Sequence, residues 1–117
     1  MADNPLFGVH GTALQLRAQR MGVLASNIAN ASTPGFKAKD IDFQAAMRSA
    51  DAAGGIGKGQ IDSATLFRTP TQPSLDGNTV ELSTEQTAFA ENAVAYQTTL
   101  SFLNGRISQL TRALRGE

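Results

Sequence analysis

The sequence contains no cysteine and no tryptophan, and its formal charges sum to zero. Without cysteine, the chain cannot form a disulfide framework, a thiolate metal site or a cysteine nucleophile. Ten basic residues balance ten acidic ones, so no overall field attracts nucleic acid or an acidic membrane surface. No apolar run approaches the roughly 18 residues of a membrane span, and the N-terminus lacks the features of a signal peptide. We therefore expect no nucleic acid partner and an export route without a cleaved signal.

Signatures of catalysis and of cofactor binding are also missing. The glycine-rich run 52–60 lacks phosphate-loop spacing, because Gly59 follows Lys58 where that loop needs serine or threonine. His10 is the only histidine, and with no carboxylate pair near it in sequence it makes neither a metal site nor a triad. The turn 76–78 resembles only a fragment of a calcium loop. We predict a protein that is not an enzyme, with no cofactor, no metal and no small-molecule substrate.

The last third of the chain carries the strongest pattern. From Leu82 to Leu114, nearly all positions reached by alternating steps of four and three are apolar. This 3.5-residue period, sustained over four heptads, predicts a helix with one narrow apolar seam that pairs with another helix. Ser83 and Gln86 fit a capping box at its start. The predicted packing residues of this helix are Phe89, Tyr96, Leu100, Leu103, Ile107 and Leu110.

A second helix is predicted from about Val9 to Ala31. Its apolar residues repeat every seven positions, while Leu16 and Val23 project to roughly the opposite side. The two seams are expected to meet inside one subunit, and the longer last helix should then overhang by about ten residues. The predicted packing residues of the first helix are Leu14, Met21, Leu24 and Ile28.

A turn is expected directly after the first helix. Pro34 disfavours helical backbone at Thr33, so the helix must end by about Ser32. Proline followed by Gly35 then suits a type II turn that ends at Phe36. In the middle of the chain, the run 52–60 is too glycine-rich for stable structure. A short helix over 43–51 and a short strand or extended arm over 61–68 remain open.

The predicted fold is therefore all-α, with long N- and C-terminal helices forming an antiparallel coiled coil and an irregular extended or loop middle segment. Residues 1–37 supply the N-terminal helix and turn, residues 38–81 the irregular middle with its glycine-rich linker, and residues 82–117 the C-terminal heptad helix. Both helices also have a polar but uncharged second face, which we expect to pack on neighbouring subunits. A solvated face that merely lacks charge is the alternative. Candidate hydrogen-bonding residues on these faces are Asn27, Asn30 and Thr98.

Two motifs resemble a known family. Residues 25–37 (Ala-Ser-Asn-Ile-Ala-Asn-Ala-Ser-Thr-Pro-Gly-Phe-Lys) resemble the N-terminal signature of bacterial flagellar rod and hook (axial) proteins. Residues 72–80 (Gln-Pro-Ser-Leu-Asp-Gly-Asn-Thr-Val), followed by 89–92 and 96–97, are similar to rod members of that family. The resemblance implies that residues in the first motif contact an adjacent subunit: Asn27, Asn30, Thr33, Pro34, Gly35 and Phe36.

The resemblance also implies a function. It suggests a structural subunit of the flagellar basal-body rod, in the periplasm, that assembles into the drive shaft transmitting torque for motility. The implied partners are copies of the chain, other rod proteins, membrane-ring and adaptor proteins at the rod base, and the type III export apparatus. A free-standing helical-hairpin adaptor or an export chaperone would share the heptads, and another axial rod component is the nearest rival within the family.

Overall fold

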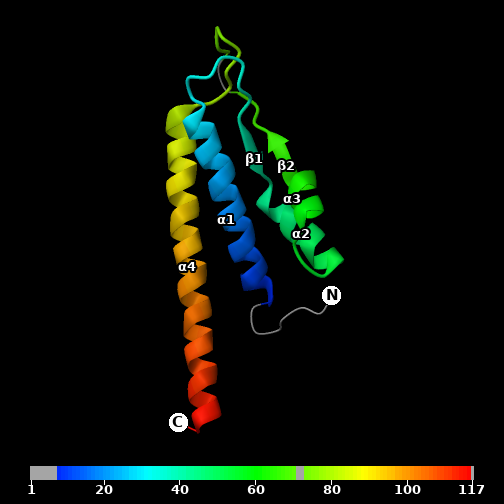
Figure 1. Cartoon of the computed structure of the whole chain (residues 1–117), viewed down its shortest axis with the longest axis vertical. Coiled ribbons are helices and arrows are strands. Elements are labelled where there is room, and N and C mark those ends of the chain that lie inside the picture. The colour runs from blue at the N-terminus through cyan, green and yellow to red at the C-terminus, as the bar shows by residue number, and fades with distance from the viewer. Residues whose placement is uncertain (1–7, 71–72, 117) are drawn as a thin grey trace.

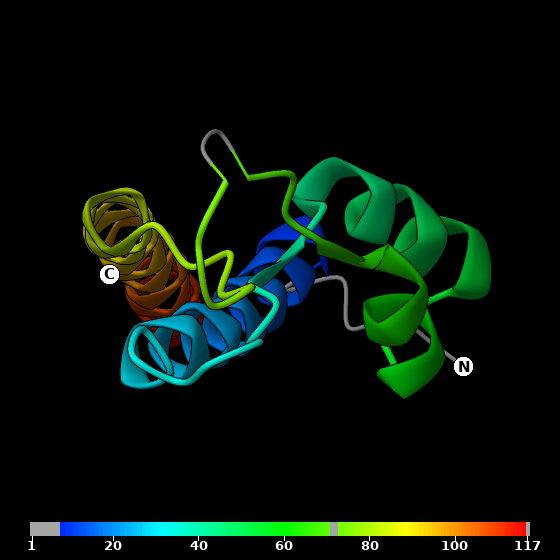
Figure 2. The same ribbon diagram turned by 90° about the horizontal axis from the view of Figure 1, so that it is seen from above.

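The computed structural model describes residues 8–70 and 73–116, which form an elongated molecule of 65 × 27 × 18 Å. The described residues form four helices and two short strands: α1 (Gly8–Ala29), β1 (Lys39–Ile41), α2 (Phe43–Ala53), α3 (Lys58–Ala64), β2 (Thr65–Phe67) and α4 (Leu82–Arg115). Helices α1 and α4 run antiparallel side by side (Figure 1). The elements of the middle segment lie on the other side of α1, away from α4 (Figure 2).

The two long helices and the turn over residues 33–36 agree with the sequence prediction. Helix α1 ends at Ala29, two residues before the predicted Ala31. The Phe36 N–H donates to the Thr33 carbonyl oxygen at 3.2 Å, and Gly35 has φ +75°. A positive φ at the third residue of the turn is what a type II turn requires, so glycine is needed at this position.

The described chain is mostly helical, as predicted, but its middle segment is not irregular, because it contains two short helices and a small sheet. Strands β1 and β2 pair antiparallel, with Asp40 opposite Leu66, and helices α2 and α3 lie between them in the sequence. Asp42 caps α2 by accepting a hydrogen bond from the Ala45 N–H at 3.1 Å. Gly54 ends the same helix in the left-handed conformation, at φ +78°. Gly54 therefore ends α2, Gly57 is the N-cap of α3, and the run does not abolish structure.

A small apolar core lies between α1 and the middle segment. Leu16 is fully buried against residues of β1, α2 and α3, and Val23 packs at the edge of this cluster. The second face of α1 therefore packs on the middle segment of the same chain at Leu16 and Val23. The partners of Leu16 in the buried cluster are Ile41, Ala46 and Ala64.

The contact between α1 and α4 is more polar than the heptad pattern predicts. On α4 the buried side chains are Glu85, Asn92 and Leu103, of which only Leu103 belongs to the predicted seam. On α1, Leu24 is fully buried. The remaining predicted packing residues within the paired region are half-buried: Leu14, Met21, Ile28, Phe89, Tyr96 and Leu100.

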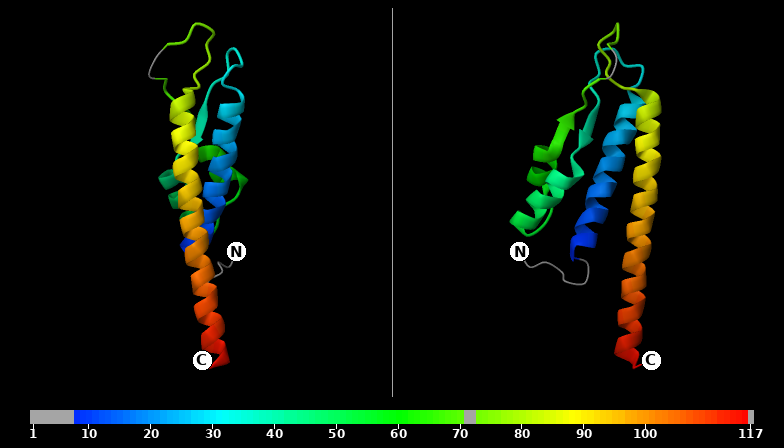
Figure 3. Two further views of the ribbon diagram at one scale, coloured as in Figure 1. Left: turned by 90° about the vertical axis from the view of Figure 1, so that its left-hand side faces the viewer. Right: turned by 180° about the vertical axis from the view of Figure 1, so that it is seen from behind.

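The ends of α4 also differ in part from the prediction. The capping box at Ser83 is wrong, because α4 begins at Leu82 and its N-cap residue is Glu81, whose side chain makes no capping hydrogen bond. At the other end, α4 continues past the described start of α1 (Figure 3). The rings of His10 and Phe102 lie 4.5 Å apart, and every residue from 104 to 116 is exposed. The predicted overhang is confirmed, and it lies at the C-terminal end.

Candidate functional site

The two motifs that resemble axial proteins bind each other where α1 and α4 meet. We call residues 30–38 and 76–80 together the loop junction. The Gly35 N–H donates to the Asp76 carbonyl oxygen at 2.9 Å, and the Thr79 N–H donates to the Phe36 carbonyl oxygen at 2.9 Å. The Ala38 N–H donates to the Thr79 hydroxyl at 2.7 Å. Two segments far apart in sequence are thus joined by backbone and side-chain hydrogen bonds.

Asn78 is the centre of the loop junction and is only 7% exposed. Its Nδ2 lies 2.9, 3.1 and 2.7 Å from the carbonyl oxygens of Asn30, Ala31 and Thr33. Its Oδ1 accepts a hydrogen bond from the Val80 N–H at 2.7 Å. All three carbonyls follow Ala29, the last residue of α1, so a side chain far away in sequence holds the turn that follows this helix.

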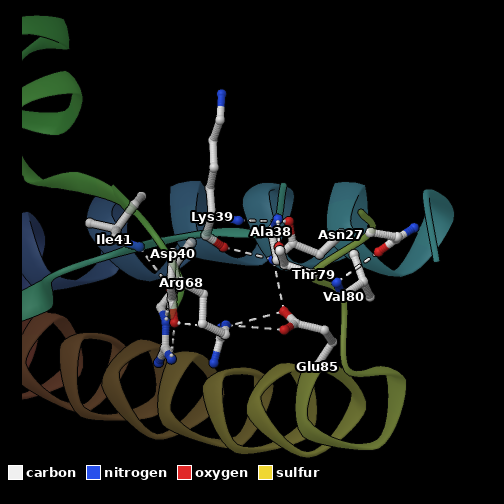
Figure 4. Close-up of polar contacts among 11 residues, drawn as sticks. Asn27, Ala38, Lys39, Asp40, Ile41, Arg68, Thr79, Val80 and Glu85 are labelled. Carbon is white, nitrogen blue, oxygen red and sulfur yellow. Dashed lines mark hydrogen bonds and ion pairs between the residues drawn. The ribbon is translucent and has the colours of Figure 1, made fainter. Parts of the chain in front are cut away.

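A buried asparagine joins α1, β1 and α4. Asn27 donates from Nδ2 to the Lys39 carbonyl oxygen and to Oε1 of Glu85, both at 2.7 Å. Its Oδ1 accepts a hydrogen bond from the Lys39 N–H at 3.1 Å (Figure 4). The Asn27 amide therefore pairs with the backbone of β1 as a neighbouring strand would. Asn27 is 1% exposed, and both ends of its amide are engaged within the subunit.

Arg68, which follows β2, bridges two carboxylates. Figure 4 shows it between Asp40 and Glu85. Its Nη2 donates to Asp40 Oδ2 at 3.0 Å, and its Nε lies 3.1 Å from Oε2 of Glu85 in an ion pair. Arg20 of α1 binds Asp40 through two hydrogen bonds, of 2.8 and 2.9 Å. Two cations and two anions thus alternate from α1 through the sheet to α4, and we call these four residues with Asn27 the polar network.

The charges of the polar network stabilise one another. The hydrogen bond from Arg20 to Asp40 raises the pKa of the Arg20 guanidinium. Burial alone would raise the pKa of Asp40, but hydrogen bonds from Arg20 and the Ile41 N–H, with the positive charges of Arg20 and Arg68, bring that pKa below its ordinary value. Both residues therefore stay ionised at neutral pH.

The other residues predicted to contact neighbouring subunits lie in two separate places. Asn30 lies in the loop junction, where it donates to the Ser26 carbonyl oxygen at 2.8 Å and accepts from the Thr33 hydroxyl at 3.0 Å. Pro34 and Gly35 are exposed at the surface of the same junction. Thr98 lies elsewhere, on an exposed face of α4, and donates to the Val94 carbonyl oxygen at 3.0 Å. The structure therefore brings the first motif together but leaves Thr98 apart from it.

Sequence reasoning missed the residues that hold the site together. Glu85 and Asn92, seven residues apart, share one side of α4, and Asn92 donates to the Arg17 carbonyl oxygen at 2.8 Å. Their spacing of seven residues, beside the apolar seam, was the sequence signal that could have indicated that both face α1. The described residues offer no group of three or more potential metal ligands. None of the described helices has the length and apolarity needed to cross a membrane.

The C-terminal overhang, residues 104–115, is the least covered part of the fold. Its apolar side chains continue the seam of α4 beyond α1. Ile107 is 39% exposed, Leu110 43% and Leu114 89%. The same segment carries Arg106, Arg112 and Arg115. This surface is suited to contact another protein helix, whereas Asn27, Glu85 and Asn78 are buried within the subunit.

Comparison with known proteins places the chain in a family. The profile of the family described as "Flagella basal body rod protein" matches residues 7–37. A flagellar basal body rod protein FlgB from Cereibacter sphaeroides is 48% identical over 120 residues, covering 94% of each chain. FlgB from Aeromonas hydrophila is 44% identical over 95% of this chain and 93% of its own, and FlgB from Escherichia coli K12 is 41% identical over 88% of each.

These similarities do not favour a hairpin adaptor, an export chaperone or another axial component, and the family is structural, not enzymatic. The chain therefore belongs to the FlgB family of flagellar basal body rod proteins, structural subunits that assemble with other components of the basal-body rod.

Proposed function

We propose that the chain forms the rod by packing against copies of itself and against other rod proteins, and that the resulting shaft transmits torque for motility. Membrane-ring and adaptor proteins at the rod base are its further partners, and the type III export apparatus delivers it to the periplasm. The observation that carries this proposal is the exposed seam of the C-terminal overhang. Three large apolar side chains in phase with the buried part of the helix need a covering surface.

In this proposal, residues 1–37 and 82–117 form one antiparallel coiled-coil unit, and residues 38–81 are an arm attached to it. The half-buried seam residues of α1 and α4 pack within the subunit. The seam residues of the overhang pack between subunits, together with the exposed turn at Pro34 and Gly35 and the face of α4 around Thr98. Close-packed protein interiors deform little, so a shell of such units resists shear when one end is turned.

The experiment replaces Leu110 by aspartate in cells that express the full chain. Leu110 is 43% exposed, so the purified variant should keep its helicity while losing the apolar contact. We expect basal bodies without this subunit and cells that do not swim. Gln109→Asp places the same charge on the neighbouring exposed position and should assemble normally. Leu103→Asp is less informative, because Leu103 is buried inside the subunit and its loss also disturbs the fold.

Normal incorporation and swimming of Leu110→Asp would refute the proposal that the overhang seam mediates assembly. The rival functions also predict different results. A free-standing adaptor or chaperone would be a folded, soluble small oligomer, and it would be absent from purified basal bodies even for the native chain. Sedimentation of the purified chain and analysis of purified basal bodies separate these cases.

A further inference from the structure

The two edges of the small sheet differ. On β1, the Asn27 amide binds both the N–H and the carbonyl oxygen of Lys39, so a side chain occupies the place of a neighbouring strand. Strand β2 is the outer strand and lies on the side of the molecule away from α4 (Figures 1 and 3). No element of the described chain pairs with its outer edge. The sheet is therefore closed on one side and open on the other.

Phe67 carries the open backbone groups of β2. In an antiparallel pair, residues whose N–H and carbonyl groups point toward the partner strand alternate with residues whose groups point away. The Arg68 N–H donates to the Ala38 carbonyl oxygen at 2.8 Å, so the backbone of Arg68 points toward the β1 side. The N–H and carbonyl oxygen of Phe67, one residue earlier, therefore point to the outer edge. Within the described residues, no hydrogen bond involves either group.

The side chains on this edge are apolar and exposed. Phe67 is 67% exposed and Leu66 is 55% exposed, and the two lie on opposite faces of the strand. Free strand edges in soluble proteins are commonly protected by charged side chains or proline, but Thr65, Leu66 and Phe67 include neither. An added strand would bind the open backbone groups of Phe67 and cover both apolar side chains. The edge is thus suited to the addition of a strand from another chain.

The charge beside the edge indicates the chemistry of the added strand. Lys39 lies directly opposite Phe67, and its Nζ is 5.4 Å from the centre of the Phe67 ring. Within the described residues, this ammonium group forms no ion pair. The ammonium lies over β2, and neighbouring strands are only about 4.8 Å apart, so a carboxylate on an added strand would reach it.

We propose that the outer edge of β2 binds an extended segment of a different protein, which adds as a third strand and places a carboxylate beside Lys39. A second copy of β2 does not fit this edge, because the pairing would bring two Lys39 charges together and would end after one two-fold contact. Main-chain hydrogen bonds supply affinity, and the exposed Leu66 and Phe67 supply apolar contact. The inference goes beyond the proposed function and does not use the overhang seam, so either can fail alone.

The test is photo-crosslinking of the full chain in living cells. A photoreactive amino acid replaces Thr69, an exposed residue two positions after Phe67, and crosslinked peptides are identified by mass spectrometry. Phe67→Pro removes the outward N–H and the ring, whereas Phe67→Thr removes only the ring and keeps a strand-forming residue. Lys39→Glu reverses the charge at the edge, and Lys39→Arg keeps it. Arg48→Glu makes the same reversal on the exposed surface of α2 and is the matched control.

We expect the native crosslink to lie on a non-helical, carboxylate-bearing segment of another protein. Phe67→Pro and Lys39→Glu should each lower its yield by about tenfold or more, with Lys39→Arg and Arg48→Glu near the native yield. Phe67→Thr should lower the yield less than Phe67→Pro does. Circular dichroism of the purified variants should show unchanged helicity.

Equal yields for the proline and threonine variants would overturn the strand addition, and a native yield for Lys39→Glu would overturn the acidic partner. A crosslink found only on a helix, on lipid or on a copy of β2, or no crosslink at all, would overturn the inference as a whole. Each of these results leaves the incorporation of the native chain into basal bodies intact. Absence of the native chain from basal bodies refutes the proposed function, and the crosslink from whole cells still decides this inference.

Discussion

Replacing Arg68 by methionine removes the cation that the two carboxylates of the polar network share. Glu85 is 0% exposed, and without Arg68 its charge keeps only the hydrogen bond from Asn27. Asp40 keeps both hydrogen bonds from Arg20, so the loss falls mainly on Glu85. Removing one partner of a buried ion pair costs about 3–5 kcal/mol, because the remaining charge stays buried and uncompensated. The Arg68 side chain is 20% exposed, which lets water approach, so we expect about 3 kcal/mol.

The assay is urea unfolding of the purified chain at neutral pH, followed by far-ultraviolet circular dichroism. Four proteins form a double-mutant cycle: the native chain, Arg68→Met, Glu85→Gln and the two together. The neutral amide of Glu85→Gln can still accept a hydrogen bond from Asn27 but needs no cation. The double variant should therefore be more stable than Arg68→Met alone, and the coupling free energy should be about 1–3 kcal/mol. The exposed Arg48, changed to methionine, is the control and should stay within about 0.5 kcal/mol of the native chain.

Two results would contradict this reasoning. If the two single substitutions were additive, Glu85 and Arg68 would not be stabilising each other across the α4–β2 contact. If Arg68→Met cost no more than the control, the ion pair between Arg68 and Glu85 would not stabilise the fold.

Three further perturbations test the junction and the network by the same unfolding assay. Gly35→Val should cost about 1–2 kcal/mol, because Gly35 has φ +75°, while Gly35→Asn should cost less since asparagine tolerates this conformation. Asn78→Ala should cost about 2 kcal/mol, because carbonyls of the turn after α1 lose their donor, and Asn78→Asp should be no better since a carboxylate cannot donate. The pKa of Asp40 is lowered in the folded chain, so its stabilisation is present above the ordinary carboxyl pKa of about 4 and is lost as pH falls through the lowered value. Asp40→Asn should therefore reduce the loss of unfolding free energy as the pH falls below about 4.

Each of these three has a clear contrary outcome. Equal stability of the valine and asparagine variants at Gly35 would show that the turn does not depend on a positive φ. A native-like Asn78→Ala would mean that water replaces the Asn78 amide without loss. An unchanged loss of unfolding free energy at acidic pH in Asp40→Asn would assign the pH dependence to other carboxylates.

The long helices and the turn were predictable because their signals are local. A heptad repeat and a Pro-Gly pair act over a few residues, and both specify backbone structure without reference to the rest of the chain. The overhang followed from the difference in helix length alone. The short helices of the middle segment were underestimated, because Asp42 and Gly54 were not interpreted as the caps they form. The run 52–60 was interpreted by composition, and composition does not distinguish a helix end from a flexible linker.

The polar network was not predictable from the same patterns. Asn27 and Glu85 are 58 residues apart in sequence, and nothing local indicates that they meet. Glu85 fits equally well as an exposed acidic residue at a helix start, and Asp40 fits a charged surface strip. Asn78 has the sequence context of an ordinary turn residue. In each case the local interpretation is chemically reasonable, and the tertiary contact that replaces it depends on how two distant segments pack.

The buried polar contacts fix the register of the α1–α4 pair, which the apolar seam alone does not. A heptad repeat matches itself after a slip of seven residues, about 10 Å along the helix, with apolar side chains still facing each other. Glu85 with Asn27, and Asn92 with the Arg17 carbonyl oxygen, have their partners in only one register. A slip would leave these buried groups unpaired, which is the best-attested reason for retaining polar residues in a helical interface. The register sets how far the overhang projects and, in the assembly proposed above, where the next subunit is placed. The polar contacts thus make the interface less stable than an all-apolar one would be, but they restrict it to one register and the subunit to one length.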